Sequence, residues 1–241
     1  MSRRPFRSSR VETLGWVEWF ALLPPALRLG GEHLVGLARY VAGASGEPST
    51  VWNLKPPSTA WVSAAEESAS VLSDGFMRHS KRAWFFASAL ALAERKELDQ
   101  ELLYVVSLLH DTGLFAPIDG QCFTATGARL AQETAAKAGV SVVRADLAAH
   151  AISNHISIRP TGELSQYLQK GSLLDVTGSG IWKLDRTVVP EECRRLPRAG
   201  FPAELRRLWL KECRRVPYGR SQYARCPGLL IAATRLAPLP Q

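Results

Sequence analysis

The chain of 241 residues is long enough to form one large domain that buries most of its unfolded surface. Hydrophobic residues make up 46% and charged residues 22% of it, which argues against a disordered chain and a membrane bundle. The formal charge of +8 arises at the ends, because residues 1–10 carry +4, residues 11–185 carry −4 and residues 186–241 carry +8. The basic ends lack any module signature, so we do not expect a nucleic-acid partner.

The cysteines and the apolar stretches indicate the compartment. None of the four cysteines belongs to a Cys-x-x-Cys pair or has zinc-ribbon spacing, so they are interpreted as reduced, cytosolic thiols. The apolar stretch at residues 17–29 is broken by charges and prolines, so no secretory signal is predicted. The longest apolar runs are too short to cross a bilayer. We therefore expect a cytoplasmic protein without a transmembrane segment, and we leave open whether it forms a homo-oligomer.

Turn-forming residues divide the chain into three parts. They cluster at residues 43–48 and 56–58, so residues 1–57 are expected to form an arm or cap that packs on the main body. Residues 58–185 are expected to form the main domain. Residues 186–241 are expected to form a basic helical extension of the same compact unit.

The main body is predicted to be all-α. From about residue 63 apolar residues recur three and four positions apart, and no alternating run is long enough for a sheet. Helices are expected at about residues 74–95, 99–112, 126–138, 141–156, 163–175, 190–196 and 202–215. The last helix carries an apolar stripe of Leu205, Leu208 and Trp209 beside basic residues. We expect the stripe to dock on the core; the alternative is a surface for a partner or a membrane.

Histidine and aspartate side chains suggest a metal site. Four of the five histidines fall between residues 79 and 155 on predicted helices. His110 and Asp111 end an apolar helix, where a carboxylate beside an imidazole requires a cation. Asp175 is predicted to point into the core as well. Together with His79 they form a mixed nitrogen and oxygen set that suits zinc, manganese or iron and leaves a position open for water or substrate. A His-Asp pair also occurs by chance.

Five sequence blocks add a family resemblance. They are His79-Ser80-Lys81-Arg82, Leu108 to Gly113, Gly127-Ala128, Ala151 to His155, and Gly171 to Gly178. Their order and spacing, from about residue 58 to residue 180, resemble the HD-domain metal hydrolases. In detail they look most like the cyanamide hydratase branch.

The resemblance implies an all-helical HD fold in which residues 58–185 are the HD domain. It implies that His79, His110, Asp111 and Asp175 bind a divalent ion, zinc in the first instance, and that Asp111 also belongs to the catalytic group. It places His155 near the ion, as a substrate contact, an acid/base group or a ligand of a second ion. Arg82 shares a helix face with His79 and is expected either to bind an anionic substrate or to form a structural salt bridge.

Three functions follow as hypotheses. The first is a hydrolase or hydratase in which a metal-activated water attacks a small polar substrate similar to cyanamide or a nitrile, with His155 moving the proton. The second is an HD-type phosphohydrolase of nucleotides or phosphoesters, with Arg78, Lys81 or Arg82 binding the phosphate. The third is a non-enzymatic regulatory or interaction module. Many HD phosphohydrolases have a lysine closely after the His-Asp pair, whereas here the pair is followed by Thr112 and Gly113. The missing charge favours the hydrolase or hydratase of a small polar substrate. His150 is left outside the site, as a surface partner of Asp146.

Overall fold

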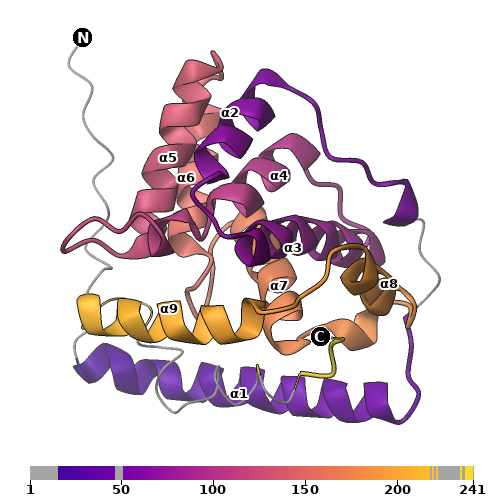
Figure 1. Ribbon diagram of the computed structural model, residues 1–241. Helices are drawn as coiled ribbons and strands as arrows, with labels where there is room; N and C mark the ends of the chain where they lie inside the picture. The colour runs from indigo at the N-terminus through magenta and orange to yellow at the C-terminus, as the bar shows by residue number, and fades with distance from the viewer. Residues whose placement is uncertain are drawn as a thin grey trace.

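The computed structural model describes residues 16–46, 51–217, 219, 221, 234 and 237–240. This part of the chain contains helices and no strands, so the predicted all-α fold is confirmed (Figure 1). The α-helices are α1 (Trp16–Val41), α2 (Ala60–Ala69), α3 (Asp74–Ala93), α4 (Gln100–Leu109), α5 (Phe123–Lys137), α6 (Val142–Asn154), α7 (Glu163–Thr177), α8 (Val188–Arg195) and α9 (Phe201–Arg215). Three short 3₁₀ helices are η1 (Val51–Asn53), η2 (Thr112–Leu114) and η3 (Ile181–Lys183).

Local sequence signals account for most helix ends. The side chains of Ser73, Asp99 and Ser141 accept hydrogen bonds from backbone N–H groups in the first turns of α3, α4 and α6. Gly178 ends α7 with a φ of +77°, a left-handed conformation that glycine adopts without strain. These boundaries agree with the predicted ones to within a few residues.

Helices α2 and α5 differ from the sequence prediction in the main body. Helix α2 was not predicted; it is capped by Thr59, and Trp61 of this helix donates a hydrogen bond to Thr134 of α5 at 3.1 Å. Helix α5 begins at Phe123, three residues before its expected start, because the buried carboxylate of Glu212 accepts a hydrogen bond from the Phe123 N–H group. Both differences arise from contacts between segments far apart in sequence.

The core is built around the pair α3 and α7, with α5 and α6 packed together beside them (Figure 1). Gly171 allows α7 to approach α3 closely. A Cβ atom at this position would lie 2.1 Å from the carbonyl oxygen of Ala83, which no real side chain tolerates. The short distance between the two helices brings side chains of α3 and α7 into direct contact in the interior.

The N-terminal arm is expected to pack on the body, and much of it is the single helix α1. Gly36 of α1 lies against the indole of Trp182 in η3, where a Cβ atom would be 2.2 Å from the ring. Arg186 donates a hydrogen bond to the carbonyl oxygen of Tyr40 at the end of α1. The sequence suggests packing of the arm through the aromatic residues Trp16, Trp19 and Phe20, whose backbone lies in α1 but whose side chains are outside the described part of the structure.

Helix α9 docks on the core through its apolar stripe, as predicted. Leu205, Leu208 and Trp209 are buried, whereas its residues Arg207, Lys211 and Arg214 are exposed.

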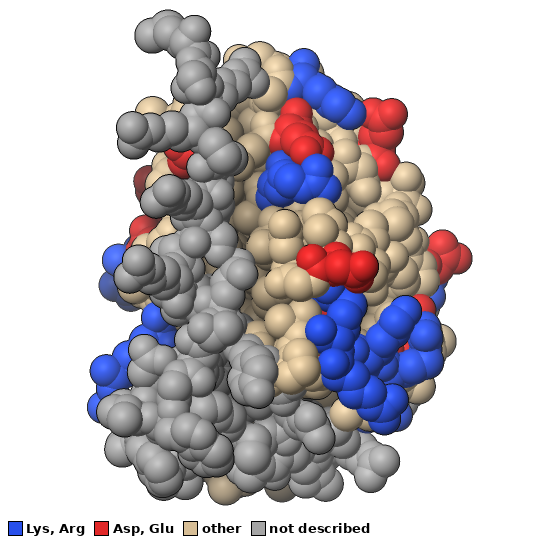
Figure 2. All heavy atoms as spheres, turned by 90° about the vertical axis from the view of Figure 1, so that its left-hand side faces the viewer, with Lys and Arg blue, Asp and Glu red and all other residues tan. Residues whose placement is uncertain are grey.

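Figure 2 shows basic side chains gathered low on the face turned to the viewer. Among the described helices, none has the length and apolar composition needed to cross a membrane.

Candidate metal centre

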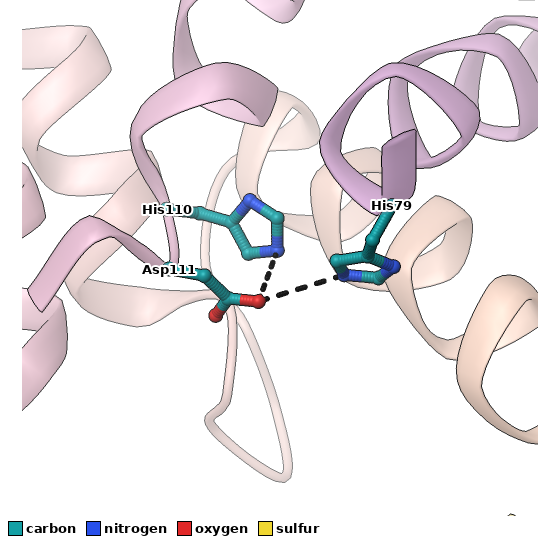
Figure 3. Close-up of side chains that lie close together, drawn as sticks. All are labelled: His79, His110 and Asp111. Atoms are coloured by element: carbon teal, nitrogen blue, oxygen red, sulfur yellow. Dashed lines mark ion pairs between the residues drawn. The ribbon is translucent and has the colours of Figure 1, made fainter. Parts of the chain in front are cut away.

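Three buried side chains from α3 and from the end of α4 converge in the interior (Figure 3). His79 lies on α3, His110 is the C-cap residue of α4, and Asp111 follows directly. Asp111 Oδ2 lies 3.3 Å from Nε2 of His110 and 3.5 Å from Nε2 of His79. Two ligand atoms at about 2.1 Å from one tetrahedral ion lie roughly 3.4 Å apart. The spacing therefore fits a single divalent ion.

The hydrogen bonds on the far side of each imidazole fix its tautomer. Nδ1 of His110 lies 2.7 Å from the carbonyl oxygen of Ser107, and Nδ1 of His79 lies 2.6 Å from Oδ2 of Asp175. Both oxygens only accept, so each Nδ1 carries the proton and each Nε2 carries a lone pair. Neither Nε2 atom has a hydrogen-bond partner among the residues that the structure describes, although both are buried. A cation is the group that satisfies two lone pairs and a carboxylate at one point.

The electrostatic surroundings keep His110 neutral. Burial lowers the pKa of this imidazole, and His79 lowers it further, while the neighbouring carboxylate of Asp111 opposes both effects. A neutral imidazole is the form that binds a metal ion. His110 is therefore already in the protonation state in which an imidazole binds a divalent cation.

Asp175, the fourth expected ligand, lies on the side of the His79 ring that faces away from Asp111. Its Oδ2 atom contacts Nδ1 of His79, on the ring edge opposite Asp111. Burial by itself raises the pKa of this carboxyl, but the Arg82 guanidinium and the hydrogen bond from His79 hold that pKa well below its ordinary value. In this structure the charge of Asp175 is balanced by arginine, and the carboxylate orients an imidazole.

Arg82 is the partner of Asp175 in a buried salt bridge. Its Nε and Nη2 atoms donate to the two carboxylate oxygens at 2.7 and 2.8 Å, and Nη1 donates to the carbonyl oxygen of Leu196 at 2.9 Å. The side chain is fully buried. Of the two expectations for Arg82, the structural salt bridge is the one observed, and the donors that would bind a substrate are engaged elsewhere.

His155 lies at the end of α6, where it is the C-cap residue and is buried. Its ring centroid is 5.1 Å from that of His110, in an edge-to-face arrangement. Nδ1 lies 2.6 Å from the carbonyl oxygen of Ile152, so the neutral ring carries its proton on Nδ1 and a lone pair on Nε2. The structure therefore brings His155 beside the converging group.

The other histidines lie outside this cluster. His150 is exposed and contacts Thr161, with Nε2 at 3.1 Å from the hydroxyl oxygen, whereas Asp146 accepts a hydrogen bond from Gln132. The expected pair of Asp146 and His150 is therefore replaced by other contacts, although both residues are on the surface as predicted. His33 of α1 lies edge-on to Trp182.

Two site residues were missed by the sequence analysis. The ring of Phe201 stacks on that of His79, with centroids 4.4 Å apart and an interplanar angle of 15°. Arg198 donates a hydrogen bond from Nη2 to the carbonyl oxygen of Asp175 at 2.7 Å. Both lie more than 100 residues along the chain from His79, and no local motif marks them.

Comparison with known proteins agrees with this geometry. The HD domain family matches residues 76–193, the segment that contributes every residue of the converging group and His155. By this match the segment is similar to the HD domain. The family consists in general of metal-dependent hydrolases. No curated protein gives a significant match to the chain.

Proposed function

We propose that the chain is a metal-dependent hydrolase or hydratase whose ion is bound by Nε2 of His79, Nε2 of His110 and the carboxylate of Asp111. The observation that carries the proposal is a pair of buried Nε2 atoms that both face one carboxylate oxygen and have no hydrogen-bond partner in the described part of the chain. Zinc is the first choice because it accepts a mixed nitrogen and oxygen set, and manganese or iron would also suit this set. Three protein ligands leave a position open for water or substrate.

A divalent ion at this point would make water a nucleophile near neutral pH. The protein supplies the remaining chemistry. The rings of Phe76, Phe115 and Phe201 meet edge to face on the His79 side, with centroids about 5 Å apart, and exclude bulk water from that side. Asp111 contributes the negative charge of the group. This charge would partly neutralise a divalent cation bound in the buried interior.

His155 is proposed to move the proton. In the hydration of a nitrile, the water oxygen forms a bond to carbon while one water proton is transferred to nitrogen. An imidazole with its lone pair on Nε2 can accept the first proton and return it to the nitrogen, because its ordinary pKa lies near neutrality. The anchored Nδ1 atom of His155 and its position beside His110 support this role.

A small polar substrate is favoured over a phosphate ester. A phosphoryl group requires cations on its equatorial oxygens. Of the three cations that the sequence offered for this task, Arg82 is bound to Asp175, and Nε of Arg78 donates to the carbonyl oxygen of Pro197 at 2.9 Å. Only Lys81 is not engaged by a described contact of this kind. We therefore propose a neutral substrate of the cyanamide or nitrile class.

A substrate panel tests the proposal. The protein is purified, loaded separately with zinc, manganese and iron, and assayed against cyanamide, aliphatic nitriles, phosphomonoesters and nucleotides. Hydration of cyanamide or a nitrile that disappears on chelation and returns with the ion supports the proposal. Turnover of phosphoesters alone would assign the site to the phosphohydrolase hypothesis. Absence of turnover on the whole panel, with metal bound, would contradict the proposed substrate class.

A further inference from the structure

The segment 196–201 lies beyond the part of the chain that matches the HD family, yet it closes the back of the metal centre. The carbonyl oxygens of Leu196 and Pro197 accept hydrogen bonds from Nη1 of Arg82 at 2.9 and 3.3 Å. The ring of Phe201, at the start of α9, stacks on His79. A connector between two helices thus contacts both a proposed ligand and the arginine behind it.

Arg198 in this connector is a buried cation aimed at the same place. Its side chain is 1% exposed. Nη2 donates to the backbone carbonyl oxygen of Asp175, and Nε lies 3.3 Å from the carboxylate oxygen Oδ1. A buried guanidinium is costly unless it is paired, so its location indicates that its charge acts on this carboxylate. Asp175 therefore lies between two arginines, Arg82 from α3 and Arg198 from the connector.

Three hydrogen bonds and one further ion pair hold the Asp175 carboxylate. Oδ2 accepts from Nδ1 of His79 and from Arg82, while Oδ1 accepts from Nε of Arg82 and faces Nε of Arg198. A carboxylate has about four acceptor positions, two on each oxygen. Three of these positions accept hydrogen bonds, and the charge of Arg198 lies beside Oδ1, so Asp175 is set to hold His79 in place.

We propose that Arg198 is a positioning residue of the metal centre: it holds Asp175 behind His79, and Asp175 keeps the His79 proton on Nδ1, which leaves Nε2 for the ion. The inference rests on the proposed binding of a metal by His79. Carboxylates behind a metal-binding histidine orient the ring and raise its basicity, and their loss commonly weakens metal affinity by roughly 10- to 100-fold. Arg198 acts one contact further out, through Asp175.

Metal affinity measures this role directly. The zinc dissociation constant is determined by competition with a chelator for the wild type, Arg198→Met, Arg198→Lys and the control Arg194→Ala, whose side chain is exposed and paired with Glu191. We expect Arg198→Met to bind zinc roughly 10-fold more weakly, within the range for such outer partners. Arg198→Lys, which keeps the charge and a donor nitrogen, should recover part of the loss, and the control should match the wild type.

The tautomer of His79 provides a second readout that needs no metal. A long-range proton–nitrogen correlation spectrum of the metal-free protein should show His79 protonated on Nδ1 in the wild type. In Arg198→Met the two tautomers should mix, because Asp175 is less firmly held. A wild-type His79 protonated on Nε2 overturns the proposal.

The folding and the metal binding of the variants determine how the other outcomes bear on the proposal. Melting curves establish that the variants are folded at the temperature of the titration. A folded Arg198→Met with wild-type affinity and a single His79 tautomer overturns the proposal, and so do Arg198 variants that never fold, because Arg198 would then serve the fold and not the centre. Failure of the wild type to bind any ion would instead contradict the proposed function, while the tautomer spectrum still tests the pairing of Asp175 with His79.

Discussion

Oδ2 of Asp175 lies 2.6 Å from Nδ1 of His79, on the ring edge opposite the carboxylate of Asp111. His79 therefore has an anionic acceptor on one side and the open ligand position on the other. A carboxylate behind an imidazole makes its far nitrogen a stronger electron donor to a cation. This relationship gives α3 and α7 a shared part in the centre, and it depends on how closely the two helices pack.

The close packing of α7 on α3 is expected to tolerate no side chain at position 171. In Gly171→Ala the new Cβ atom would lie 2.1 Å from the Ala83 carbonyl oxygen and 2.7 Å from the Ala87 nitrogen, so a helix must shift. Overpacking of this kind costs about 1–3 kcal/mol, and the upper end applies because the obstacle is backbone. Urea unfolding should show this loss. The neighbouring Ser172→Ala should change stability by less than about 0.5 kcal/mol, and an unchanged Gly171→Ala would show that the helices are less close.

His155 is expected to affect turnover and leave metal binding intact. Since its ring lies beside His110 with Nδ1 anchored on Ile152, removal of the ring takes away the proton carrier without removing a ligand. His155→Ala should keep its ion and lose roughly 10²- to 10⁴-fold in kcat, the usual size of a general acid/base contribution. Metal analysis and steady-state kinetics on the active substrate measure both quantities.

The exposed His150 provides the matched control for His155. His150→Ala should retain activity within a few-fold, because its ring contacts Thr161 on the surface. Full activity in His155→Ala would mean that this residue only caps the C-terminus of α6, where the partial negative charge of the helix end stabilises a positively charged group. Loss of the ion in His155→Ala would make it a ligand.

Glu94 is expected to make stability depend on pH in acid. Burial raises the pKa of its carboxyl, but hydrogen bonds from Lys170, Lys183 and Tyr167 outweigh burial and bring that pKa from 4.5 to about 2. The unfolded state therefore binds more protons than the folded state between these values. The contribution of Glu94 is complete above pH 4.5 and is lost as the pH falls toward 2.

The variant Glu94→Gln isolates this contribution. It should be less stable than the wild type at neutral pH, and the difference should shrink as the pH falls below 4.5. Urea unfolding midpoints at a series of pH values compare the two proteins. A difference that stays constant down to the acid limit would show that the three partners do not stabilise the ionised carboxylate.

Local patterns predict most of the fold. Capping residues such as Ser73 and Ser141 lie next to the helices they begin, and Gly178 lies where α7 ends. Each of these boundaries is therefore predictable from the residues next to it. The same holds for the converging group. His110 and Asp111 are adjacent at the end of an apolar helix, and this position alone predicts that both side chains lie in the interior.

Features that depend on distant contacts were not predictable. The role of Asp175 depends on which edge of the His79 ring it meets, and the burial of two arginines beside it decides this. Arg198 and Phe201 reach the centre only through the path of the connector after α8. The start of α5 depends on a carboxylate in α9. None of these contacts leaves a periodic or spaced signal in the sequence.

The metal content of the purified protein tests the central claim most directly. Wild type, Asp111→Ala and the surface control Asp146→Ala are dialysed against metal-free buffer, offered zinc, manganese or iron, and analysed by elemental mass spectrometry. Asp111 lies beside Nε2 of His79 and Nε2 of His110, whereas Asp146 accepts a hydrogen bond from Gln132 on the surface. The account predicts close to one ion per chain in the wild type and Asp146→Ala, and almost none in Asp111→Ala, with activity lost in parallel. A wild type that retains no ion under any of these conditions, or an Asp111→Ala that retains as much as the wild type, would contradict it.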